Sequence, residues 1–157
     1  MLAEVETYLE RLRYARAEIL KTLDDLSVDA LNWHPLPDET NSLYALATHL
    51  LGAERGWLHE LIGQRQIERD RSAEFRARGE DITSLRLEYN TVARESEDIL
   101  ERLVESDMAA SRGKDASNMH TVRWCILHIV EHYNEHLGQM RLTRQMWENR
   151  SARPHEI

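Results

Sequence analysis

The feature that most constrains the fold is the helical spacing of apolar residues in four long stretches of the chain. The clearest stretch alternates spacings of four and three without a break, at Leu85, Tyr89, Val92, Ser96, Ile99 and Leu103. Residues at these spacings share one face of an α-helix with about 3.6 residues per turn. No stretch shows sustained alternation of apolar and polar residues, so strands are not expected. The sequence therefore predicts an all-α protein.

Four amphipathic helices bury their apolar faces most simply as a four-helix bundle. We expect the long helices at residues 2–26, 42–63, 81–105 and 120–149, with a turn or short helix at 27–33 and a loop at 108–119. Ser27 and Asn41 or Ser42 are suited to cap helix starts, and Gly63 is suited to follow a helix end. Residues 1–150 are predicted to form one domain, followed by a tail at 151–157.

The polar segment from Gln64 to Glu80 separates the second predicted helix from the third. At about 3.3 Å per extended residue it can recross the roughly 30 Å length of a 20-residue helix. A crossover of this kind makes those two helices parallel, which is an up-down-down-up bundle. Its arginines are interspersed with acidic residues, so we interpret the segment as a solvated linker rather than as a basic patch.

Composition and charge exclude several classes of partner. The formal net charge of −8 argues against a nucleic-acid partner, which needs a basic surface. No apolar run approaches the roughly 18 residues of a membrane span, and the charged N-terminus does not resemble a signal peptide. The single cysteine, Cys125, cannot form an internal disulfide, so we expect a cytoplasmic protein.

Three histidines, His128, His132 and His136, lie four residues apart in the fourth predicted helix. At about 100° per residue, His136 falls within the apolar face, His132 at its edge and His128 further round. Two histidines at i and i+4 can bind one metal ion. The inward pair is therefore His132 and His136, and His128 is expected to pack or to support a ligand.

The third ligand must come from another helix. His49 is expected on the shoulder of the second apolar stripe, facing a neighbouring helix, whereas His59 is expected to point away from that stripe. The predicted metal ligands are thus His49, His132 and His136, a donor set that suits Zn²⁺, Ni²⁺ and similar divalent ions. The alternative, that these are hydrogen-bonded core histidines, stays open at this point.

Other metal motifs fit less well. His132–His136 matches the H-x-x-E-H pattern of inverted zinc peptidases, but Glu135 points away from the histidine pair. Those enzymes also need a further downstream carboxylate ligand, and only 21 residues follow His136. The di-iron bundle motif needs a glutamate three residues before a histidine, and Ile129, Tyr133 and Leu46 occupy those positions. Cys125 lies in the apolar stripe, which favours core packing over a nucleophilic role.

Several further residues have weaker expectations. Glu54 or Glu131 are candidates to hydrogen-bond the ligand imidazoles from outside. Gly138 is expected to allow close helix contact, and Gln139 to orient a ligand or simply to pack. Trp33 and Trp57 are interpreted mainly as packing residues, with the mouth of a pocket as the alternative.

Three motifs together resemble the DinB-like or YfiT-like superfamily of bacterial metal-binding four-helix proteins. They are Leu-Asn-Trp-His-Pro at 31–35, Asn-Ser-Leu-Tyr-Ala-Leu-Ala-Thr-His-Leu at 41–50, and the segment 128–139 with its His-x3-His followed by Gly-Gln. The resemblance covers most of the chain. It implies an up-down-down-up bundle, a three-histidine metal site at His49, His132 and His136, and a homodimer.

The resemblance also implies a reaction. Characterised members are thiol-dependent transferases or isomerases that use mycothiol, bacillithiol or glutathione. One mycothiol-dependent branch has a glutamate as the middle ligand, where this chain has His132. The hypothesis is that a metal-bound thiolate attacks a small electrophile held between the second and fourth helices. The alternative is a non-catalytic, metal-bearing structural or stress-response dimer.

Overall fold

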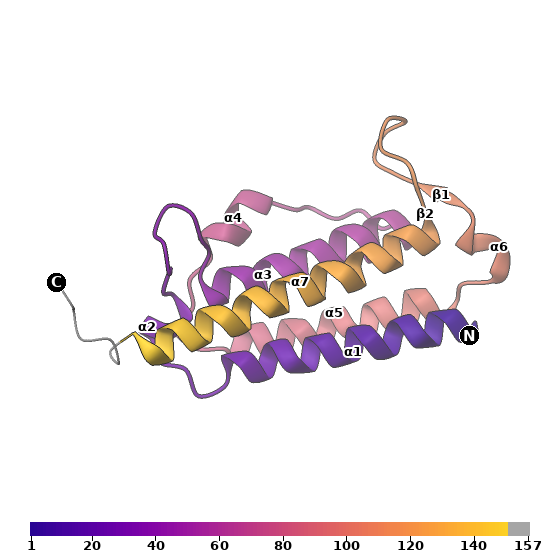
Figure 1. Ribbon diagram of the computed structural model, residues 1–157. Coiled ribbons are helices and arrows are strands. Elements are labelled where there is room, and N and C mark those ends of the chain that lie inside the picture. Colours follow the sequence, from indigo (N-terminus) through magenta and orange to yellow (C-terminus); the bar gives the residue numbers. More distant parts are fainter. Residues whose placement is uncertain (151–157) are drawn as a thin grey trace.

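A computed structural model describes residues 1–150, and the tail predicted for residues 151–157 lies outside them. Helices make up most of the described chain (Figure 1). In chain order the elements are α1 (Ala3–Leu23), α2 (Val28–Leu31), α3 (Leu43–Glu54), the π-helix η1 (Arg55–Ile62), α4 (Arg71–Arg76), α5 (Thr83–Glu101), α6 (Glu105–Met108), β1 (Ser111–Arg112), β2 (His120–Thr121) and α7 (Val122–Asn149). The predicted all-α class is therefore confirmed.

Helices α1 and α7 lie side by side and run in the same direction. Near their starts, Arg123 Nη2 donates to Glu4 Oε1 at 2.7 Å, and near their ends Arg144 Nη1 donates to the Thr22 carbonyl at 3.0 Å. Figure 1 shows both helices running from the end of the bundle that carries the N-terminus towards the end that carries α2.

Helices α3 and α5 run the opposite way. The Tyr89 hydroxyl donates to the Ala47 carbonyl at 2.9 Å, and further along both helices His59 Nε2 lies 2.9 Å from Ser96 Oγ. The chain from η1 therefore has to return along the bundle before α5 begins (Figure 1).

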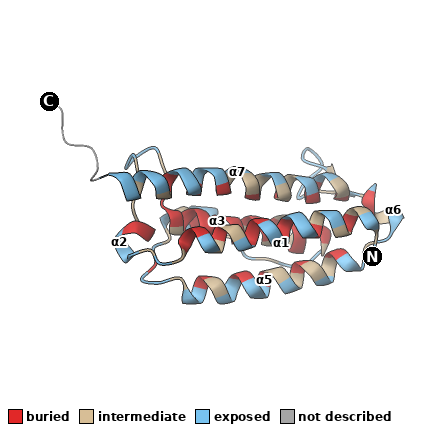
Figure 2. Cartoon of the chain, turned by 60° about the horizontal axis from the view of Figure 1, so that its bottom comes forward, coloured by how far each residue is buried: buried red, intermediate tan, exposed pale blue. Residues whose placement is uncertain are grey.

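Buried residues recur along one side of each long helix (Figure 2). In α5 the first four positions of the predicted stripe, from Leu85 to Ser96, are all at most 3% exposed. The starts of α3 and α2 are fixed by side-chain caps, because Ser42 Oγ accepts from the Ala45 N–H and Ser27 Oγ accepts from the Ala30 N–H. The expected cap positions at Ser27 and Ser42 are thus confirmed.

The crossover between α3 and α5 is helical in part, so it is not only the solvated linker that was expected. It contains α4, which packs beside α3 (Figure 1) and buries Glu74 to 8% exposure. Asp70 caps this short helix by accepting from the Ala73 N–H at 2.9 Å. The helix forms because its cap and its burial against α3 outweigh the polar composition of the segment.

The connection between α5 and α7 was also predicted incompletely. Within the expected loop, Ser111 pairs with Thr121 and Arg112 with His120 as two short antiparallel strands (Figure 1). His120 therefore belongs to β2, and Thr121 caps α7 through its hydroxyl. Two residues per strand are too few to produce a visible alternation in sequence.

The second long helix changes type after Glu54. Its last eight residues, Arg55–Ile62, form a π-helix, and Gly63 follows its end as predicted. The i→i+5 turns of a π-helix rotate later side chains away from their α-helical positions. His59 is consequently buried to 1% exposure, so the expectation that it points away from the core was wrong.

Among residues 1–150, no helix combines the length and apolarity needed to cross a membrane.

Candidate metal centre

The three histidines predicted as ligands come together between α3 and α7. One nitrogen from each of His49, His132 and His136 lies within 4.8 Å of the others. His49 Nε2 is 3.0 Å from His132 Nε2. His49 is buried and the two α7 histidines are half-buried, so the group sits just beneath the surface.

Residues of the crossover hold His49 in place. His49 Nδ1–H donates to Glu74 Oε2 at 2.9 Å, and the Phe75 ring stacks on the imidazole with centroids 4.3 Å apart. Arg69 fixes the carboxylate from its other side, through Nε to Oε1 at 2.6 Å and Nη2 to Oε2 at 2.9 Å. The imidazole is therefore oriented with Nδ1 outward and Nε2 towards the other histidines.

Gln139 performs the same role for His136. Its Oε1 accepts a hydrogen bond from His136 Nδ1 at 2.7 Å, one turn further along α7. The expectation that Gln139 orients a ligand residue therefore has a direct contact behind it. Gly138 does not allow a close helix contact, because a Cβ built there would meet nothing within 4 Å.

The imidazoles of His49 and His132 are in the protonation state that a metal ligand needs. Burial, together with the neighbouring histidines, lowers the pKa of His132 to about 4. Burial also lowers the pKa of His49, although Glu74 opposes the shift. Both side chains are thus neutral near pH 7, and the proton of His49 lies on Nδ1 because a carboxylate can only accept it. Its Nε2 lone pair then faces the shared centre.

This donor set fits a divalent metal ion. Metal-bound histidines commonly donate their other ring N–H to a carboxylate or amide oxygen, as His49 and His136 do here. Within residues 1–150, no cysteine, aspartate or glutamate joins the group of three. Three nitrogen ligands without a fourth protein ligand is the arrangement that leaves a position for water or substrate.

Two alternatives considered for nearby residues are not supported. Cys125 is fully buried in the core and burial raises the pKa of its thiol, so it packs rather than reacts. Glu54 does not support the ligand imidazoles, because its carboxylate accepts hydrogen bonds from Arg16, Ser96 and Tyr133 in the bundle interior. Glu131 is exposed on α7.

A row of rings continues from the histidine group along α7. His128 lies with its ring centroid 4.9 Å from Trp124 and 4.6 Å from Trp57, outside the ligand group. His120 stacks on the Trp124 ring, with the two ring centroids 3.7 Å apart. His128 and Trp57 therefore pack, which is the role that helical phase and composition predicted for them.

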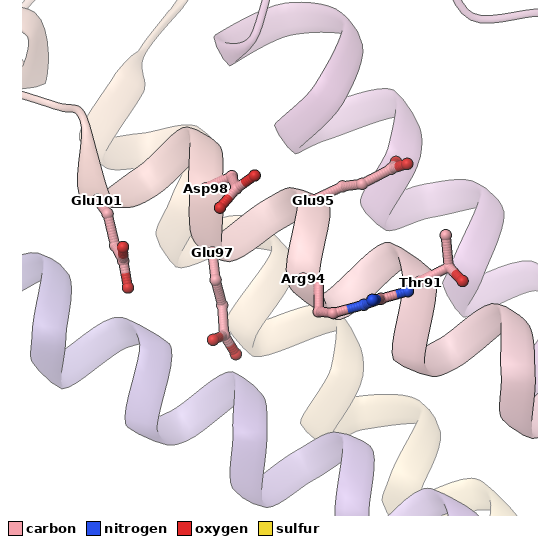
Figure 3. A pocket seen from close by; sticks show the side chains of 6 residues that line it. All are labelled: Thr91, Arg94, Glu95, Glu97, Asp98 and Glu101. Carbon is pink, nitrogen blue, oxygen red and sulfur yellow. The ribbon is translucent and has the colours of Figure 1, made fainter.

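A hollow lies away from the histidines, on the outer face of α5 (Figure 3). Two of its carboxylates contact neighbouring helices: Glu97 accepts from Arg13 of α1 at 3.1 Å, and Glu95 lies 3.3 Å from His59 Nδ1 of η1. Figure 3 shows these two side chains pointing towards those two helices. The hollow is a product of helix pairing, and we assign it no chemistry.

Sequence reasoning missed the crossover residues of the site, Arg69, Glu74 and Phe75. The Asp70 cap was a visible signal for a short helix there. Nothing in the sequence shows that this helix lies on His49, because its placement depends on the path of the crossover.

A helical bundle with three convergent imidazoles between two of its helices is the class of protein that the fold and the site define. The chain matches the family model described as Mycothiol-S-transferase over residues 7–148, and it belongs to that family. The family falls within the DinB-like group that the sequence motifs resemble.

Solved structures show the same fold. A conserved protein from Enterococcus faecalis aligns with a TM-score of 0.74 at 14% identity, covering 93% of this chain and 98% of that one. A DinB-like protein from Bacillus cereus aligns with a TM-score of 0.69 at 18% identity, covering 91% of this chain and 92% of that one. No functionally curated protein gave a significant match.

Proposed function

We propose that this protein is a metal-dependent thiol S-transferase that acts on a small electrophile. Membership of the Mycothiol-S-transferase family supports the reaction class. The observation that carries the proposal is which ring nitrogens of the histidine group are already engaged in hydrogen bonds. Nδ1 of His49 and of His136 is occupied by an outer acceptor, which leaves Nε2 of each available to bind an ion.

His49, His132 and His136 are the residues that would hold a divalent ion, with Zn²⁺ and Ni²⁺ as the best candidates. The chemistry that such an ion would supply is a lowered pKa for a thiol bound to it, which would favour the thiolate form. Glu74 and Gln139 keep the ligand rings in one orientation and in the required tautomer. Phe75 covers one face of His49 and keeps water from it.

The proposal extends to the cellular setting. A low-molecular-weight thiol is the proposed cosubstrate, because thiols of this kind stay reduced in a cytoplasm that also suits a protein with a single free cysteine. We further propose that the protein works as a homodimer, as expected from the family resemblance.

Metal analysis and a transfer assay test the proposal. Purified protein should contain about one divalent ion per chain, and His49→Ala should lose most of it. Metal-loaded protein should accelerate the reaction of mycothiol, bacillithiol or glutathione with monochlorobimane well above the His49→Ala rate. The matched control is His128→Ala, which removes a histidine from the same row but outside the ligand group and should keep the metal.

Two results would count against the proposal in different ways. A metal content near zero, with unchanged stability, would remove the metal centre. Full metal content with no transfer rate above His49→Ala would remove the transferase and support the non-catalytic, metal-bearing alternative.

A further inference from the structure

An apolar groove begins one helical turn beyond His136. It has a volume of about 430 Å³, within the usual range for small-molecule sites. The groove lies between the segment 35–41, α3 and α7. Its α7 wall consists of Gln139, Leu142, Thr143 and Met146, and Leu46 contributes from α3.

The groove is contiguous with the histidine group on both helices. On α7, Gln139 lines the groove and also accepts the hydrogen bond from His136 Nδ1. On α3, Leu46 precedes His49 by three residues, so both lie on one face of the helix. A molecule lying in the groove therefore has one end at Gln139, which contacts His136 of the histidine group.

The walls favour an apolar occupant. Leu36, Leu142 and Met146 line the groove and are 52%, 58% and 43% exposed, so apolar surface lies open to solvent on its 35–41 wall and on its α7 wall. In the part of the chain that the structure describes, the one charged side chain among the lining residues is Glu39. A groove with a carboxylate and no lining cation disfavours an anionic ligand. Methionine adds a flexible surface that adapts to different shapes.

We propose that this groove binds the hydrocarbon part of an uncharged electrophilic acceptor and directs its reactive carbon towards the histidines. The inference rests on the proposed function and specifies its substrate class. For an alkyl halide, the thiolate sulfur forms a bond to carbon while the carbon–halogen bond breaks, and the halide leaves with the electron pair. Atoms and charge balance without a further reactant.

Binding is tested first, without any reaction. The neutral fluorophore N-phenyl-1-naphthylamine is bound to metal-loaded protein and displaced with 1-butanol, 1-hexanol and 1-octanol. Affinity should rise by up to about fourfold for each added methylene, because each one is removed from water. In metal-free protein, where no ion can bind the carboxylate, octanoate should bind more weakly than 1-octanol, since Glu39 repels it.

The variants locate the site. The double substitution Leu142→Gln and Met146→Gln should raise the dissociation constant of 1-octanol by about tenfold or more, from the loss of apolar contacts. Both side chains are exposed, so the fold should be kept, as circular dichroism can verify. The matched control is Leu87→Gln on α5, which is 64% exposed and remote from the groove and should leave binding unchanged.

The outcomes separate this inference from the proposed function. Equal 1-octanol binding by the wild type, the double variant and the control would overturn the groove, even if transfer to monochlorobimane proceeds. Chain-length-dependent binding that the double variant loses would establish the groove, even if no transfer is found. If ultracentrifugation shows that the double variant instead turns a dimer into a monomer, with alkanol binding unchanged, the groove is an interface between copies and the inference is wrong.

Discussion

His49 Nδ1 and Glu74 Oε2 lie 2.9 Å apart, and this contact joins the second bundle helix to a residue 25 positions later in the crossover. It is buried from both sides, with Glu74 8% exposed and His49 3% exposed. The carboxylate is also paired with Arg69, so its position is fixed independently of any ligand. The predictions begin from this pair.

Removing the carboxylate should weaken metal binding without removing a ligand. We expect Glu74→Ala to lower the affinity for Zn²⁺ by about 10–100-fold, because the His49 ring loses the acceptor that sets its orientation and tautomer. Competition with a chelating dye measures the affinity. The control Glu68→Ala removes an exposed carboxylate from the same segment and should leave the affinity unchanged. Equal affinities for the two variants would contradict the role given to Glu74.

The close approach of α4 to α3 depends on Gly52. A Cβ at this position would overlap Oε1 of Glu74. We therefore expect Gly52→Ala to displace the carboxylate and to lower Zn²⁺ affinity, although alanine favours a helix by up to about 1 kcal/mol.

Gly138→Ala is the matched control, because its Cβ would meet nothing within 4 Å. It should raise the free energy of unfolding by about 0.5–1 kcal/mol and leave the affinity as it is. If the Gly52 variant bound Zn²⁺ as tightly as the Gly138 variant, the packing of α4 would not matter for the site.

The bundle interior holds a buried ion pair between Arg16 and Glu54, which are 5% and 0% exposed. Arg16→Met leaves the Glu54 carboxylate buried without its cation, and we expect a loss of about 3–5 kcal/mol in the free energy of unfolding. Adding Glu54→Gln should recover most of the loss, because both charges are then gone while the amide oxygen still accepts from the buried Tyr133 hydroxyl. Urea denaturation compares the variants, and equal midpoints for the single and double variants would contradict this account.

Acid should destabilise the metal-free protein partly through His59. Burial lowers the pKa of His59, although Glu54 and Glu95 oppose the shift. Between the lowered pKa and about 6.5, the unfolded chain binds more protons, so the free energy of unfolding falls as pH falls through this range.

His59→Gln keeps a donor for Ser96 and should reduce the slope by at most about 1.4 kcal/mol per pH unit. Denaturation of the metal-free protein between about pH 5 and about pH 7.5 measures both slopes. A variant as pH-sensitive as the wild type would show that His59 does not titrate on unfolding.

Local patterns predicted much of this molecule, because local interactions dictate it. The stripe from Leu85 to Ser96 and the caps at Ser27 and Ser42 follow from spacing and hydrogen bonding within a few residues. The inward pair His132 and His136 follows from helical phase. His49 could be added because the apolar stripe of its own helix fixes which way it faces.

The remaining features depend on contacts between distant segments. His59 was misplaced because the turn to a π-helix after Glu54 changes the phase, and no local signal marked that change. Glu74 was overlooked because one buried carboxylate in a polar run has the same sequence signature as an exposed one. Its burial follows only from the path of the crossover over α3.

The position of α4 divides the site between two parts of the chain. The bundle helices carry the three histidines proposed as ligands and also form the core, so a change in them affects stability and the site together. The crossover packs on the outside of α3 and supplies the acceptor for His49. Residues 64–80 thus form an exchangeable module: swapping this segment between relatives should retune the metal centre while the core stays the same.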